Sequence, residues 1–137
     1  MRYPEQIVCR KLAATPAVAR HLGFRVFPMM VPASAQLPFA TYQRTGVVRQ
    51  KTLTVPAGVP TVTVALNFYA ESYQTVRELA DSVREALDHY RGTVQGVAVS
   101  NVTIEDESES VVDLEGGDLP PAWQVSMVAN IEWQEVQ

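Results

Sequence analysis

The chain has 137 residues, 47% of them hydrophobic, so it is long enough for one domain with its own core and too apolar for a disordered protein. It has no signal-peptide-like start, no apolar run near the roughly 18 residues of a membrane span, and one cysteine, Cys9, which excludes an internal disulfide. The net charge of −4 comes without a basic cluster, which argues against tight nucleic-acid binding. We therefore expect a soluble protein made in a reducing cytoplasm.

The N-terminal part of the chain predicts two helices. Pro4 suits the first turn of a helix that runs to about Ala14. Thr15 is a candidate N-cap for a second, short helix, with Pro16 at its first position and Gly23 just past its end.

Strands are expected near 24–31, 38–48 and 61–70. Pro28 and Pro32 argue that the first of these is an edge strand or is broken, because proline cannot donate to the ladder. Strict alternation in the third strand predicts one core-facing side, made of Val62, Val64, Leu66 and Phe68.

A long amphipathic helix is predicted over about 73–91, with Ser72 as N-cap and Gly92 ending it. Its apolar residues recur at three- and four-residue spacing and form one stripe: Tyr73, Val76, Leu79, Ala80, Val83, Ala86, Leu87 and Tyr90. On the exposed side, Arg77 is expected to pair with Asp81, and Arg84 with Asp88.

The last part of the chain predicts a weak strand near 96–104 and a strong one that closes the chain. In the closing strand one face carries Trp123, Val125, Met127, Ala129, Ile131 and Trp133. The order of elements indicates a single α+β domain over residues 1–137, with a mostly antiparallel sheet, one long amphipathic helix on one sheet face and a short N-terminal helical segment.

Catalytic and metal-binding patterns are not found. His21 and His89 are expected to be solvated surface residues, since neither has a metal-ligand partner at a suitable spacing. The acidic residues near Asp106 lack the spacing and central glycine of a calcium loop, so a solvated acidic loop is favoured over calcium binding. No nucleotide or nucleophile motif is present, and we expect no cofactor and no enzyme activity.

Residues 46–60 join two predicted strands but are longer than an ordinary hairpin loop, and they are apolar for a flexible loop. They either pack back on their own domain or form an arm that docks on another subunit or on a tube. The candidate interface residues are Val47, Val48, Arg49, Lys51, Leu53, Val55 and Val59.

A second unusual segment, 105–118, holds seven acidic residues and no Lys or Arg. Such a block repels itself and is expected to be a solvated loop. The acidic residues are Glu105, Asp106, Glu107, Glu109, Asp113, Glu115 and Asp118.

The stretch Leu37–Arg44 enters a strand through Pro38 and carries aromatic residues. It follows the segments Thr15–Ala19 and Gly23–Pro28, and Tyr69-Ala70 precedes the long helix. This ordered set resembles the tail-completion proteins (tail terminator or head-to-tail joining proteins) of long-tailed bacteriophages and phage-like particles, over most of the chain.

The resemblance implies a structural virion protein without catalytic residues. Such proteins form rings, commonly hexameric, that cap the tail tube and bind neighbouring copies, the tail tube protein and a head connector or stopper protein. They act in the virion neck after assembly in the host cytoplasm, and DNA passes through without sequence-specific binding. In such a ring, sheet edges near Val26–Val31 and Leu37–Tyr42 are expected to meet a neighbouring copy, and the acidic segment either faces the channel or its rim or lies on the outside.

Two other classes stay open at this point. One is a small α+β ligand-binding domain or enzyme, since this fold class hosts many activities. The other is a cytoplasmic protein-binding module that recruits a partner through an open sheet edge.

Overall fold

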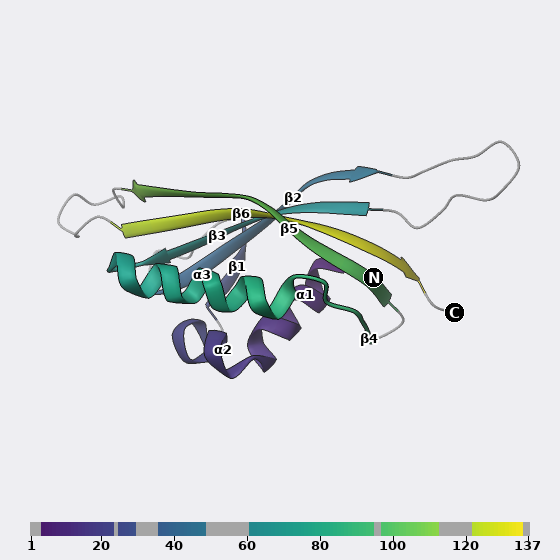
Figure 1. Cartoon of the computed structure of the whole chain (residues 1–137), viewed down its shortest axis with the longest axis horizontal. Helices are drawn as coiled ribbons and strands as arrows, with labels where there is room; N and C mark the ends of the chain where they lie inside the picture. The colour runs from purple at the N-terminus through teal and green to yellow at the C-terminus, as the bar shows by residue number, and fades with distance from the viewer. Residues whose placement is uncertain are drawn as a thin grey trace, which may run out of the picture.

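The protein is built from one sheet with helices on one of its faces (Figure 1). This computed structural model describes residues 4–23, 25–29, 36–48, 61–94, 97–112 and 122–135. The elements are α1 (Pro4–Ala14), α2 (Pro16–Leu22), β1 (Val26–Pro28), β2 (Phe39–Val48), β3 (Thr61–Ala70), α3 (Tyr73–Leu87), β4 (Gly92–Val94), β5 (Val97–Val112) and β6 (Ala122–Glu135). The expected α+β class is confirmed, although two N-terminal helices share the helical layer with the long one.

The sheet has the strand order β1-β2-β3-β6-β5-β4. β1 is parallel to β2, and every other neighbouring pair is antiparallel. The central pair, β3 and β6, is in register from Thr61 opposite Glu132 to Ala70 opposite Trp123. Alternate residues of β3 are buried, as its sequence predicts, because one face of the strand packs under the helices.

Helix α3 supplies the centre of the core. The hydroxyl of Ser72 accepts a hydrogen bond from the Thr75 N–H, so the predicted N-cap is confirmed. Its buried stripe is Val76, Leu79, Ala80, Val83 and Leu87. Tyr73 and Tyr90, which the pattern added to this stripe, lie at the margin, with Tyr73 exposed and Tyr90 partly buried.

The end of α3 differs from the prediction. The helix stops at Leu87, where Asp88 turns to an extended conformation and His89 has a φ of 64°. The His89 N–H donates to the Val102 carbonyl of β5 at 2.7 Å. Tertiary bonding to the sheet therefore ends the helix one turn early, and Gly92 begins β4 instead of ending the helix.

The junction of α1 and α2 also differs in detail. Thr15 stands at the N-cap position of α2, but its side chain makes no capping bond. Its hydroxyl donates instead to the Lys11 carbonyl at 2.7 Å, which satisfies the end of α1. The two helices are thereby joined with almost no linker.

The two lateral sides of the sheet end differently. β1 is the outermost strand on one side, as the prolines predict, and pairs with β2 only over Ala40–Tyr42. On the other side β4 covers β5 only over Val97–Val99. Beyond that point the outer edge of β5 has no strand neighbour within the described residues, while its inner edge stays paired with β6.

Candidate assembly surfaces

The first three residues of the predicted interface arm belong to a strand. Gly46, Val47 and Val48 belong to β2 and pair with Thr63, Val62 and Thr61 of β3. The strand predicted over 38–48 is thus confirmed as far as Val48, and residues 46–48 of the segment expected as an arm are part of the β2–β3 ladder, past the bulge between Arg44 and Gly46. Val47 also packs against the core cluster. The remaining candidates lie outside the described residues: Arg49, Lys51, Leu53, Val55 and Val59.

The acidic segment is not a loop over its first part. Residues 105–112 form the second half of β5 and pair with β6 as far as Val112 opposite Ala122. Pairing with β6 and the packing of Val102 and Ile104 in the core outweigh the repulsion among the carboxylates. Asp113, Glu115 and Asp118 lie outside the described residues.

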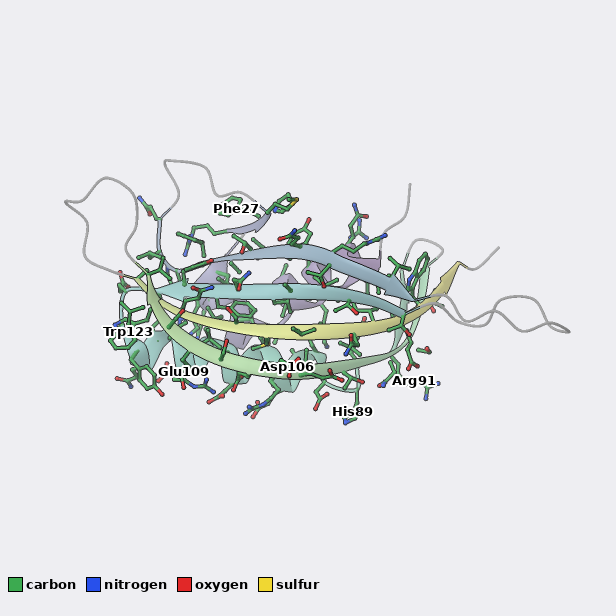
Figure 2. All side chains as sticks on the ribbon, turned by 90° about the horizontal axis from the view of Figure 1, so that it is seen from above. Phe27, His89, Arg91, Asp106, Glu109 and Trp123 are labelled. Atoms are coloured by element: carbon green, nitrogen blue, oxygen red, sulfur yellow. The ribbon has the colours of Figure 1, made fainter. Side chains whose placement is uncertain are left out.

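A bulge relieves part of that crowding. The register of β5 against β6 shifts between Glu105 and Ser108, and Asp106 adopts a φ of 51°. Asp106 is exposed at the margin of the sheet, and Glu109 lies further along the same strand (Figure 2). After the bulge, Glu109 opposes Val125, so its side chain is on the helix side of the sheet.

Glu107 joins β5 to α3 through a four-residue ion-pair network. Its carboxylate lies 3.3 Å from the Arg77 guanidinium and 3.7 Å from that of Arg84. Asp81 completes the network, at 2.8 Å from Arg77 and 3.3 Å from Arg84. Arg84 thus pairs with Asp81 and Glu107, and the expected partner Asp88 lies instead 3.4 Å from the Ile104 N–H. Burial lowers the pKa of Arg77, but the attraction of Glu107 and the hydrogen bond to Asp81 prevail and raise it.

This network should couple α3 to β5 measurably. We expect Arg77→Ala and Glu107→Ala to show a coupling energy of about 0.5–1 kcal/mol in a double-mutant cycle of urea unfolding, because removing either partner removes the same contact. Glu78→Ala, an exposed change on the same helix, should change the free energy of unfolding by less than about 0.5 kcal/mol. A coupling energy of zero would mean that the network does not tie the helix to the strand.

Three exposed apolar side chains, on α3, β5 and β6, lie together at one end of the β5 side of the sheet. The rings of Tyr73 and Trp123 meet edge to face, with centroids 5.5 Å apart. Val111 is the register partner of Trp123, and the exposed fractions are 47% for Tyr73, 53% for Val111 and 37% for Trp123. A hydrogen bond to Glu109 raises the pKa of the Tyr73 hydroxyl. We call Tyr73, Val111 and Trp123 the aromatic patch.

The sequence pattern missed this patch. Tyr73 and Trp123 both continue the apolar periodicity of their elements, so the pattern assigns Tyr73 to the buried stripe and leaves Trp123 as a core or interface residue. They lie at the start of α3 and near the start of β6, and among the described residues they contact each other while both stay exposed. The signal that could have found them is their position at the ends of both periodic stripes.

The sheet face opposite the helices is polar and mostly uncharged. The Asn67 side-chain carbonyl accepts hydrogen bonds from Gln124 at 3.1 Å and from Ser126 at 2.6 Å. The Thr63 hydroxyl donates to Asn130 at 2.9 Å. This face carries hydrogen-bonded amides and hydroxyls across neighbouring strands.

The described residues hold no group of three or more His, Cys, Asp and Glu placed to bind a metal ion. His89 is exposed, as expected, whereas His21 is only partly exposed and its Nε2 atom is buried with no hydrogen-bond partner among the described residues. Its place in the last turn of α2, against the domain, explains why it is not the solvated residue expected. No helix in the described part of the chain is long and apolar enough to span a membrane.

Comparison with solved structures shows that the fold of this chain occurs in a phage-like particle. A chain in a structure titled "Virion of native gene transfer agent (GTA) particle" matches with a TM-score of 0.66 and 16% sequence identity, covering 91% of each chain. No curated protein matches the sequence.

The family model "Tail completion protein gp17" matches residues 6–115, and the chain belongs to this family. It is thus a structural protein of phage tail assembly. The resemblance found in the sequence is confirmed.

Proposed function

We propose that copies of this chain form a closed ring that caps the tail tube and joins it to the head connector. The observation that carries this proposal is the family match over residues 6–115, which covers both helical segments and most of the sheet. The similarity of the whole fold to a chain of a gene transfer agent virion supports a place in the particle. A hexamer is the ring that we propose, with the tail tube protein and the connector protein as partners.

The surfaces support an assembly role more than a ligand-binding one. The described residues offer an aromatic patch, two incompletely covered sheet edges and a polar sheet face, all of which suit protein contacts. We propose that residues 49–60 dock on a neighbouring subunit or on the tube. For Asp113, Glu115 and Asp118 we propose the channel or its rim, where negative charge discourages DNA from binding.

Disruption of the gene tests this function. We expect the mutant to accumulate full heads and complete tails that are not joined, as counted by negative-stain electron microscopy. Supplying the wild-type chain in trans should restore joined particles. A normal number of joined particles in the absence of the protein would contradict the proposal.

A further inference from the structure

The chain is divided into two halves of opposite charge. Residues 1–70 contain eight Lys or Arg and one acidic residue, Glu5, a net charge of +7. Residues 71–137 contain three Arg and fourteen acidic residues, a net charge of −11. No Asp or Glu occurs between Glu5 and Glu71.

The strands keep these halves apart in the sheet, whereas α1, which carries Arg10 and Lys11 of the basic half, packs against β5 and β6. β1, β2 and β3 come from the basic half, and β4, β5 and β6 come from the acidic half. Because the strand order is β1-β2-β3-β6-β5-β4, the charge boundary runs once through the sheet, between β3 and β6. Phe27 of β1 and Asp106 of β5 mark the two opposite lateral sides (Figure 2).

The aromatic patch lies on the acidic side. Glu109 borders it through a hydrogen bond with the Tyr73 hydroxyl, and Asp106 follows along β5, whereas Glu107 is held by Arg77 and Arg84 in the ion-pair network. Figure 2 shows Trp123, Glu109 and Asp106 along this side of the sheet. The result is an apolar contact area bordered by carboxylates, which suits a partner that presents apolar and basic side chains.

The opposite lateral side has exposed basic side chains and, next to β1, the exposed apolar side chain of Met29. Arg20 on α2 and Arg44 on β2 are exposed there, and α2 packs against β2. Arg25, just before β1, donates hydrogen bonds to the Pro38 and His21 carbonyls at 2.7 Å each. These two bonds fix its guanidinium on this side of the domain. Described residues of β1, β2 and β3 include no acidic residue that would repel the carboxylates of the other side.

We propose that the aromatic patch and its bordering carboxylates bind the β1–β2 side of a second copy of this chain. This inference rests on the proposed ring, and it names the two surfaces that meet. A contact between two different surfaces of identical chains repeats around a ring when its rotation closes. Opposite charges on the two surfaces set the direction of each contact and oppose a contact between two like sides.

The contact does not require strand pairing along β5. The Val102 carbonyl is already bonded to His89, and the Ile104 N–H is bonded to Asp88. The bulge at Asp106 and the adjacent charges further oppose addition of a strand at this edge. Side chains of the aromatic patch therefore supply the apolar part of the contact.

Charge reversal with compensation tests the inference. Variants are supplied in trans to the gene-disrupted phage, and joined particles are counted. We expect Glu109→Lys and Arg44→Glu each to lower the number by about tenfold or more, because like charges then face each other at every subunit contact. The chain that carries both changes should recover to within about threefold of wild type, because each contact again joins opposite charges.

Two further variants test whether the position of the charge matters and whether the apolar contact matters independently of folding. Glu85→Lys makes the same charge change at an exposed position of α3 outside the ion-pair network, and it should join particles normally. Val111→Ser should lower joining while the melting temperature stays near the wild-type value, since the Val111 side chain is already largely exposed. All variants are checked for folding by circular dichroism.

The outcomes distinguish the inference from the function on which it rests. If the wild-type chain fails to restore joining, the proposed function is wrong. If the wild-type chain restores joining and the single reversals behave like wild type, only the proposed contact is wrong. If both single reversals fail and their combination also fails, the two sides bind the tube or connector protein, and the contact between copies is excluded.

Discussion

Replacing Leu79 with alanine is expected to lower the free energy of unfolding by about 2–5 kcal/mol. Leu79 is fully buried at the middle of α3, where the helix packs on the sheet. Truncation leaves a cavity that the rigid sheet cannot fill, and small domains have only about 5–15 kcal/mol of stability in total. The measurement is urea denaturation followed by circular dichroism.

Leu87→Ala provides a second test of the same face, because Leu87, the last residue of the helix, is also fully buried. Glu78→Ala is the matched control on the same helix and should cost less than about 0.5 kcal/mol. Equal losses at Leu79 and Glu78 would show that the core face of α3 is assigned incorrectly.

Replacing residues 49–60 with Asn-Gly is expected to leave the domain folded and to abolish head–tail joining. β2 and β3 are in register as far as Val48 opposite Thr61, so a two-residue turn can close the hairpin. The fold loses no described contact, whereas the segment that we propose to dock on a neighbour is removed. The measurements are the melting temperature of the variant and the number of joined particles after complementation.

A milder pair of variants separates docking from chain length. Replacing Leu53, Val55 and Val59 with serine removes the apolar side chains of the segment. This triple variant should strongly reduce the number of joined head–tail particles. Serine at Thr52 and Thr54 makes a conservative change in the same segment and should leave joining unchanged. Normal joining by the shortened chain would refute docking, and unfolding of that chain would indicate that the segment packs on its own domain.

The periodic elements of this fold could be predicted from the sequence. The alternation in β3, the stripe of α3 and the cap at Ser72 all depend on neighbours in sequence, and each is confirmed. The edge position of β1 followed from Pro28, because proline removes a donor from the ladder wherever it stands.

Features that depend on contacts distant in sequence could not be predicted. Local charge repulsion indicated a loop at Glu105–Glu109, but pairing with β6 makes it a strand. Helix spacing gave Asp88 as the partner of Arg84, whereas the fold brings Glu107 to that arginine. The aromatic patch was hidden for the same reason, since only the packed layers show where Tyr73 and Trp123 lose their cover.

Electron cryomicroscopy of intact particles at the head–tail joint tests the central claim most directly. The account predicts a closed ring of copies of this chain between the last ring of the tail tube and the connector, with an open channel along its axis. It also predicts that the aromatic patch of each copy contacts the β1–β2 side of the next. Density for this chain elsewhere in the particle, or a solid plug without a channel, would contradict the account.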